Sequence, residues 1–278
     1  MKKKVVFNFQ HGYIEGVYQK SSLENAPLVI ITNGHNGFYN YGMFPYIQQF
    51  LLEHGLSSYS YNFSHGGVKG DSDYFEDSDK YEKNCMRLET MDLYEIAKSL
   101  KNSDIQYNSK IKLFFLTHSL GGIPTIFAAK KLQGEVNLDG IILISTIKTL
   151  NVWPSSMIEE WKKNKVYLLK NNRTKQELPQ GYEFLTEILK SDTEWNIETA
   201  IKSLDTKILI LHGEKDEAVP VEHSQTLHKW TVEGGLNAEL QIIPNATHTY
   251  NTKHPFEGTS NELNNMLTIV TGWIKKNL

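Results

Sequence analysis

Three residues in the C-terminal two thirds of the chain have the chemistry and the order needed for nucleophilic catalysis. Ser119 lies in THSLG, which matches all but the first position of the G-x-S-x-G pattern of a nucleophile in a sharp strand-to-helix turn. A serine hydroxyl attacks poorly near neutral pH unless a histidine removes its proton and a carboxylate orients that histidine. Asp216 and His248 follow in the chain and carry these groups.

Each of these residues follows an apolar run that reads as a buried strand. Ser119 follows KLFFLTH, Asp216 follows KILILHGEK and His248 follows AELQIIPNAT. The carboxyl ends of parallel strands meet at one edge of a sheet, so we expect the three side chains to meet there. Taken singly, each has an ordinary reading: a helix-start turn, a helix cap near Val219 and a structural loop histidine. Their joint occurrence favours a catalytic triad.

The rest of the chain alternates strand-like and helix-like segments. This pattern predicts an α/β fold with a mostly parallel central sheet and helices on both faces. Two alternating runs at the start, 3–10 and 12–20, predict an antiparallel pair. Further strands are expected at 26–34, 56–63, 111–119, 138–146, 206–213 and 238–244, and helices at 41–55, 81–100, 121–132, 221–232 and 261–278.

The alternation breaks between residues 146 and 204. This stretch is rich in aromatic and charged residues and has no long buried run. We expect one domain over 1–278 with a small inserted cap at 146–204, between the sixth and seventh core strands.

Four segments resemble those of the α/β-hydrolase superfamily: THSLGG, LHGEKDEAVP and IPNATHTY for nucleophile, acid and base, and ITNGHNGFY for the oxyanion-hole loop. The chain is most similar to its cinnamoyl and feruloyl esterase (monoacyl esterase) group, over almost its whole length. The resemblance implies an α/β-hydrolase fold, Ser119 as nucleophile, His248 as base and Asp216 as orienting acid. It also implies oxyanion donors at the backbone N–H groups of His35 and Leu120, a small-molecule ester as substrate and no cofactor or metal.

Two residues depart from the family pattern. Thr117 stands where the family usually has glycine, and Asn33 stands where it usually has histidine. Because Gly121 and Gly122 are intact, we interpret Thr117 as a packing variation in a working turn. Asn33 replaces a structural residue whose side chain need not touch substrate.

Other histidines compete for the role of base. His118 is adjacent to the nucleophile and is expected to point away from it, while His212 ends a strand and fits a structural hydrogen bond. His254 is the main alternative to His248.

The loop NFSHGGVKGDSDYFEDSD, residues 62–79, carries two further patterns. Its His65-Gly66-Gly67 resembles an oxyanion motif but follows the strand after the expected one, so we expect it to shape the pocket wall. Its acids lack the glycine and glutamate spacing of a calcium loop, which favours a solvated loop with a helix N-cap.

Aromatic residues of the inserted stretch have two readings. Trp153, Trp161, Tyr182 and Trp195 are the candidates to line an acyl or aromatic pocket above Ser119, with Tyr167 and Phe184 beside them. Equally, they would serve as a small core for the insertion.

Composition narrows the function classes. The 278 residues carry a net charge of −3 without a basic stripe, which argues against a nucleic-acid partner. No apolar run approaches the ~18 residues of a membrane span, and the N-terminus lacks the apolar core of a secretion signal. With one cysteine and no zinc-type spacing, a cytoplasmic protein is expected.

These observations predict a serine hydrolase, specifically a carboxylesterase for small to medium acyl esters, including aromatic acyl esters. A serine peptidase or amidase of the same fold is the alternative, and a non-catalytic ligand-binding protein is a third hypothesis. The natural substrate and the oligomeric state stay open.

Overall fold

A computed structural model describes residues 2–102 and 111–278. Its centre is an eight-stranded sheet of order β1-β2-β4-β3-β5-β6-β9-β10, in which β1 pairs antiparallel with β2, β2 pairs antiparallel with β4, and the remaining pairs are parallel. The predicted sheet is therefore confirmed. The strands are β1 Lys2–Phe9, β2 Gly12–Gln19, β3 Leu28–Thr32, β4 Ser57–Tyr61, β5 Leu113–His118, β6 Gly140–Ile144, β9 Ile208–Gly213 and β10 Ala238–Ile243.

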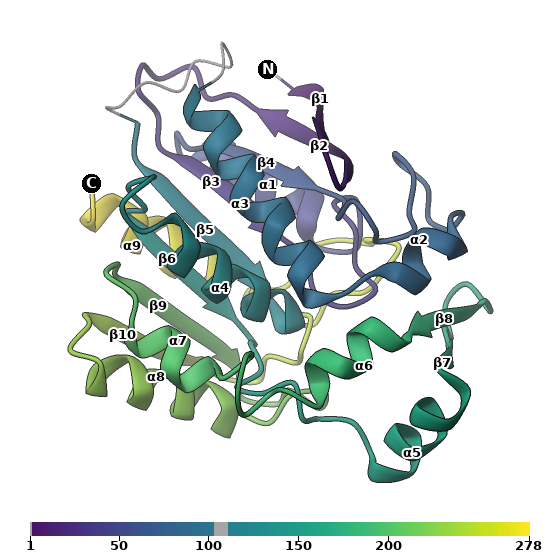
Figure 1. Cartoon of the computed structure of the whole chain (residues 1–278). Coiled ribbons are helices and arrows are strands. Elements are labelled where there is room, and N and C mark those ends of the chain that lie inside the picture. The colour runs from purple at the N-terminus through teal and green to yellow at the C-terminus, as the bar shows by residue number, and fades with distance from the viewer. Residues whose placement is uncertain (1, 103–110) are drawn as a thin grey trace.

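Helices cover both faces of this sheet (Figure 1). Along β3, Leu28 and Ile30 belong to one apolar cluster while Val29 and Ile31 belong to the other, because successive side chains of a strand point to opposite faces. The cluster that holds Leu28 contains the packed helices α3 Met86–Asn102, α4 Gly122–Leu132, α7 Ile197–Lys202 and α8 Glu222–Glu233. The other contains α1 Phe44–Glu53 and α9 Asn261–Lys276.

The helix predicted over 81–100 is wrong in one respect, since the structure breaks it into α2 Ser78–Lys83 and α3. Asn84 is extended between them, with φ −63° and ψ 140°. The carboxylate of Glu187 accepts the backbone N–H groups of Met86 at 2.6 Å and Arg87 at 3.0 Å, which satisfies the start of α3. The break depends on Glu187, which is 101 residues from Met86 in the sequence. No local glycine or proline therefore predicts it.

The chain between β6 and β9 holds two kinds of element. Helix α5 Ser155–Asn164, the antiparallel hairpin of β7 Val166–Lys170 with β8 Glu177–Gly181, and α6 Tyr182–Ile188 lie beyond the edge toward which β5 and β9 point (Figure 1). Helix α7 instead packs against α4 and α8 on the core. A separate cap over 146–204 stays a prediction, and its last helix is part of the core layer.

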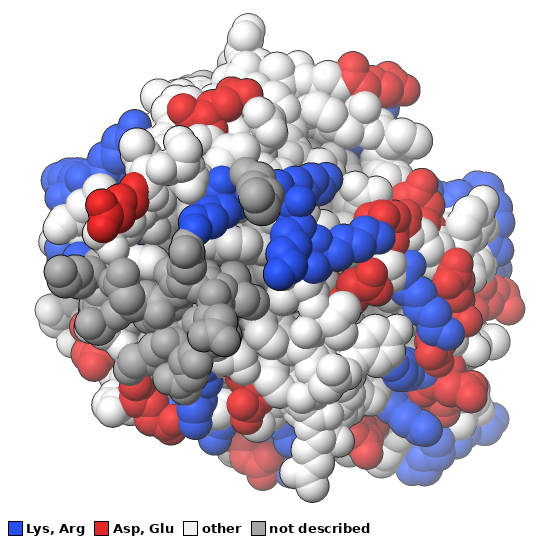
Figure 2. All heavy atoms as spheres, turned by 90° about the horizontal axis from the view of Figure 1, so that it is seen from above, with Lys and Arg blue, Asp and Glu red and all other residues white. Residues whose placement is uncertain are grey.

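The outer surface carries charges of both signs. In Figure 2, acidic and basic side chains are interspersed, with one group of basic side chains near the middle of the face shown. Among the helices of residues 2–102 and 111–278, none combines the length and apolar character needed to cross a bilayer.

Candidate active site

Ser119 occupies a strained turn between β5 and α4. Its φ is +56°, a left-handed conformation that is uncommon for a residue with a side chain and that often marks functional sites. The turn brings α4 close to its neighbours: a Cβ on Gly121 would lie 2.2 Å from the carbonyl oxygen of Asn33, and one on Gly122 would lie 2.1 Å from Cγ2 of Thr146. Glycine is therefore required at both positions.

Thr117 packs into this turn without a polar partner. Its side chain is fully buried on β5, and its Oγ1 has no hydrogen-bond partner among the described residues. That oxygen lies 3.1 Å from where a Cβ of Gly121 would be. The sharp turn thus forms with threonine at the position where the family pattern has glycine.

The structure brings Ser119, His248 and Asp216 together. Nδ1 of His248 lies 2.8 Å from Oδ2 of Asp216, and Nε2 of His248 lies 3.1 Å from Oγ of Ser119. A carboxylate can only accept, so Nδ1 carries the proton and Nε2 is free to accept from the serine hydroxyl. This is the tautomer that a general base for Ser119 requires.

The carboxyl of Asp216 is fully buried and is held on several sides. Its Oδ1 accepts the backbone N–H groups of Ala218 at 3.0 Å and Val219 at 2.8 Å. Burial alone would raise the pKa of Asp216, but hydrogen bonds from His212, His248 and the Val219 backbone outweigh it and hold this pKa well below its ordinary range. The carboxylate is therefore ionised at neutral pH.

His212 has the structural role expected from its place at the end of β9. Its Nε2 donates to the carbonyl of Val219 at 2.8 Å, and its Nδ1 lies 2.6 Å from Oγ of Ser224. The same Nε2 lies 3.3 Å from Oδ2 of Asp216. His212 thus also contacts the carboxylate that orients His248.

The expectation that His118 points away from the site is wrong. Its Nε2 donates to the backbone carbonyl of His248 at 2.9 Å, and the two imidazole rings are 4.6 Å apart. Burial, together with the charge of His248, lowers the pKa of His118 to about 3, so its ring is neutral. His118 therefore holds the loop that carries His248.

His254 has partners of its own. Its Nδ1 accepts the N–H of Gly42 at 2.9 Å, and its Nε2 lies 3.2 Å from Oδ1 of Asp73. The histidine that bonds Ser119 is His248.

The two expected oxyanion donors lie beside Ser119. His35 and Leu120 both line the same cleft as the serine. A Cβ on Gly34 would lie 2.9 Å from Cβ of Ser119, so the backbone that leads into His35 runs against the nucleophile. Within the described chain, neither N–H has a hydrogen-bond partner, and Leu120 is in the first turn of a short 3₁₀ helix, where N–H groups are free.

Two clefts meet at these residues, and both are lined by His35, Ser119 and His248. The first, the Trp153 cleft, has a volume of about 610 Å³. The second, the Arg173 cleft, has a volume of about 200 Å³. The walls of the Trp153 cleft include Leu120, Ile147, Val152, Trp153, Val219 and Pro220, and those of the Arg173 cleft include Gly37, Tyr41, Phe44, Asn171, Arg173 and Thr249.

Of the four aromatic residues expected to line a pocket, Trp153 alone is among the residues that line these clefts. Trp161 is fully buried and stacks on Phe184, with ring centres 6.0 Å apart. Trp195 packs on Phe127 of α4, with ring centres 4.6 Å apart. Tyr182 is exposed, and the ammonium of Lys165 lies over its ring. Trp161 and Trp195 therefore belong to the main apolar core, and Tyr182 belongs to the surface.

Sequence reasoning missed the polar residues of the clefts. Asn171 and Arg173 line one cleft and Lys148 lines the other. Arg173 lies in the polar sequence KNNRTK, which is typical of a solvated turn. That local pattern gives no sign that the turn folds back toward Ser119.

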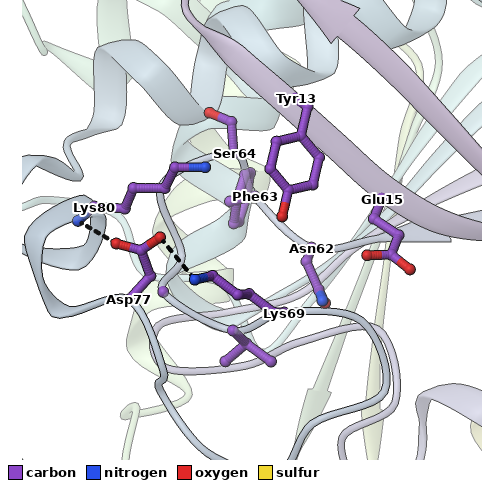
Figure 3. A pocket seen from close by; sticks show the side chains of 10 residues that line it. Tyr13, Glu15, Asn62, Phe63, Ser64, Lys69, Asp77 and Lys80 are labelled. Atoms are coloured by element: carbon purple, nitrogen blue, oxygen red, sulfur yellow. Dashed lines mark hydrogen bonds and ion pairs between the residues drawn. The ribbon is translucent and has the colours of Figure 1, made fainter.

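The loop after β4 does not form the pocket wall expected of it. It lines a separate hollow beside β2 and α2, in which the carboxylate of Asp77 pairs with the ammonium of Lys69 and accepts the backbone N–H of Lys80 (Figure 3). The volume of this hollow is about 10 Å³, enough for about one water molecule. Asp77 caps α2 as predicted. In the described part of the chain, no three or more His, Cys, Asp or Glu residues are grouped to hold a metal ion.

Comparison with known proteins supports the fold. The family model of the prolyl oligopeptidase family matches residues 154–278, which include Asp216 and His248. The solved structure of Est1E from Butyrivibrio proteoclasticus is 17% identical, with a TM-score of 0.68, over 99% of this chain and 98% of that one. A second Est1E structure, with ferulic acid bound, is 18% identical, with a TM-score of 0.69, over 98% of each chain.

A peptidase is similar in structure as well. The acylaminoacyl peptidase of Pyrococcus horikoshii is 13% identical, with a TM-score of 0.71; the match covers all of this chain and 42% of the peptidase. No curated protein matches the sequence significantly. The resemblance expected from the sequence is thus confirmed at the level of fold, and the chain has the α/β-hydrolase fold.

Proposed function

We propose that the protein is a serine hydrolase, and specifically a carboxylesterase for small to medium acyl esters, including aromatic acyl esters. In this proposal Ser119 is the nucleophile, His248 the general base and Asp216 the residue that orients the imidazole. The observation that supports it is the continuous series of hydrogen bonds from Ser119 Oγ through His248 to Asp216, beside two clefts.

The geometry is suited to the following reaction. Nε2 of His248 accepts the hydroxyl proton as Oγ of Ser119 attacks the ester carbonyl carbon. The oxyanion of the tetrahedral intermediate accepts hydrogen bonds from the N–H groups of His35 and Leu120, each worth roughly 3 to 4 kcal/mol. The imidazolium then protonates the departing alcohol and leaves an acyl group on the serine. Water, deprotonated by His248, hydrolyses this acyl-enzyme and restores the hydroxyl.

The Trp153 cleft favours an ester whose reacting end carries an apolar group. Its wall beside Ser119 is formed by Leu120, Val152 and Trp153, which suit an alkyl or aryl substituent. The similarity to an esterase structure that holds ferulic acid supports an aromatic acyl group as one option.

A peptidase or amidase is the second candidate. It is favoured by the prolyl oligopeptidase model over residues 154–278 and by the similarity to an acylaminoacyl peptidase. The same triad would serve, with an amine as leaving group. A non-catalytic binding protein is the third candidate. The hydrogen-bonding geometry of Ser119, His248 and Asp216 argues against it.

A substrate panel tests the proposal. p-Nitrophenyl esters of increasing acyl length are compared with p-nitroanilides of the same acids, with Ser119→Ala as the inactive control. We expect ester hydrolysis that exceeds anilide hydrolysis at every chain length. Hydrolysis of anilides without esters would replace the esterase by the amidase, and no hydrolysis of either would favour the binding protein.

A further inference from the structure

Arg173 lies at the turn of the β7–β8 hairpin and is fixed there by its surroundings. The Oδ1 atom of Asn171 accepts the backbone N–H groups of Arg173 at 3.0 Å and Thr174 at 3.1 Å, which holds the turn. The guanidinium carbon lies 5.4 Å from the ring centre of Phe38 and 5.6 Å from that of Tyr41. Both aromatic faces attract a cation at such distances. The positive charge is therefore held in place rather than free in solvent.

This cation has no anionic partner within the described residues. Its Nη1 donates to the backbone carbonyl of Asp73, and its Nη2 is buried and has no hydrogen-bond partner in residues 2–102 and 111–278. The carboxylate of Asp73 lies instead against His254, at 3.2 Å. A buried charged donor without a partner is costly, which makes an external anion a favourable addition.

The cation of the other cleft is compensated. Lys148 lines the Trp153 cleft, and its ammonium pairs with the carboxylate of Glu222 at 2.5 Å. The two clefts at Ser119 thus differ in net charge. One presents an apolar wall with a neutralised ion pair, and the other presents an uncompensated guanidinium.

Arg173 also lines a cavity that adjoins its cleft. This cavity has a volume of about 300 Å³ and shares Tyr41, Phe44, His118, Arg173 and Thr249 with the Arg173 cleft. Its wall includes Lys253 and His254 as well. Burial lowers the pKa of His254, and the nearby charge of Arg173 acts in the same direction, whereas the Asp73 carboxylate opposes both.

We propose that Arg173 binds an anionic group of the substrate, so that the preferred substrates are esters that carry a carboxylate. The carboxylate lies in the Arg173 cleft and the uncharged, apolar part of the ester lies in the Trp153 cleft, with the scissile carbonyl at Ser119 between them. A guanidinium suits this role because its planar N–H groups match the two oxygens of a carboxylate. This inference rests on the proposed hydrolase function.

Matched ester pairs test the preference. Monomethyl glutarate and methyl valerate differ by one carboxylate on the acyl side, and 4-carboxyphenyl butyrate and phenyl butyrate differ by one on the alcohol side. We expect kcat/KM for the charged member to exceed that of the neutral member about tenfold or more in one of the pairs, since charge-assisted hydrogen bonds contribute about 1.5–3 kcal/mol. No preference for the charged member in either pair would overturn the inference.

Variants of Arg173 and of a lysine outside both clefts test whether Arg173 causes the preference. Arg173→Gln is expected to lower the charged-to-neutral ratio of kcat/KM about tenfold or more, and Arg173→Lys is expected to give an intermediate ratio. Lys163→Gln removes an exposed cation of α5 that lines neither cleft, and this control is expected to leave the ratio unchanged. A ratio in Arg173→Gln equal to that of the wild type would overturn the inference. Circular dichroism and the melting temperature report whether each variant is folded, and Arg173→Lys keeps the charge if Arg173→Gln does not fold.

A binding measurement separates this inference from the proposed function. Calorimetric titration of Ser119→Ala with monomethyl glutarate is expected to detect binding that weakens about tenfold or more when Arg173→Gln is added. Such binding in a protein whose wild type cleaves no ester would retain the anion site and reject the hydrolase. Ester cleavage without Arg173-dependent binding or preference would retain the hydrolase and reject the anion site.

Discussion

The two clefts that meet at Ser119 share the residues of the proposed catalytic site and differ in their walls. His35, Ser119 and His248 line both. The Trp153 cleft is the larger, with apolar walls and a lysine that is paired to Glu222. The Arg173 cleft is smaller and holds a guanidinium that has no anionic partner in the part of the chain that the structure describes. The proposed catalytic residues follow the ends of core strands, whereas Trp153 and Arg173 both come from the chain between β6 and β9. The sheet therefore positions Ser119, Asp216 and His248, and the chain between β6 and β9 supplies the residue that distinguishes each cleft.

The largest effect is expected where the clefts meet. Ser119→Ala removes the nucleophile that both clefts serve, so kcat should fall about 10⁵- to 10⁶-fold for charged and neutral esters alike. Steady-state kinetics on both ester classes would check this. Activity retained on one class alone would show that the clefts do not share a nucleophile.

The losses of kcat on replacing the two candidate bases, His248 and His254, should differ by orders of magnitude. His248→Ala leaves Ser119 without a base, and we expect a loss of about 10⁴-fold or more in kcat. His254→Ala removes a residue whose bonds go to Gly42 and Asp73 and which lines neither of the two clefts at Ser119, so the loss of kcat should stay within about tenfold. The reverse order in a side-by-side comparison would move the base to His254.

In the Trp153 cleft, the preference for long acyl or aryl esters is expected to depend on Trp153. Trp153→Ala should lower kcat/KM for long acyl or aryl esters about tenfold while changing acetate esters little, because an apolar contact is worth ~1–3 kcal/mol. Trp161→Ala is the matched control. Trp161 is fully buried, so its loss should lower the free energy of unfolding by about 3–5 kcal/mol. An equal loss of kcat/KM on short and long esters in Trp153→Ala would place Trp153 outside the substrate site.

The smallest effect on activity, and a distinct effect on stability, is expected at Glu187, which joins the inserted stretch to α3. Burial raises the pKa of Glu187 to about 7, although backbone hydrogen bonds to Met86 and Arg87 oppose the rise. In the unfolded chain this pKa is about 4.3, so the folded state binds the proton more tightly. The stabilising contribution is complete below pH ~4.3 and is lost as the pH rises through about 7.

Glu187→Gln cannot titrate, so it should gain stability relative to the wild type between pH 5 and pH 8, by on the order of 3 kcal/mol. Urea unfolding of both proteins across this range measures the difference. If the difference in free energy of unfolding between the two proteins did not change with pH, the raised pKa of Glu187 would be wrong.

Much of the fold could be predicted from the sequence because its signals are local. Buried parallel strands appear as continuous apolar runs, and the glycines around Ser119 mark the close approach of α4 to Asn33 and Thr146. The break before α3 could not be predicted, since it depends on the distant carboxylate of Glu187.

In the candidate site, too, some features could be predicted from the sequence and others could not. Ser119, Asp216 and His248 stand out because each follows a strand, and they converge in the structure. The direction in which a side chain points has no comparable local signal in the sequence. Trp161 and Trp195 turn into the core, His118 turns toward His248, and Arg173 returns from a polar turn to the cleft. The catalytic roles, the cytoplasmic location and the lack of a nucleic-acid partner stay predictions.

A fluorophosphonate probe, followed by peptide mapping of the adduct, tests whether Ser119 is an activated nucleophile. We expect one covalent adduct on Ser119 in the wild type, slow labelling in His248→Ala and none in Ser119→Ala. An unlabelled wild type, or equal labelling of Ser119→Ala, would contradict it.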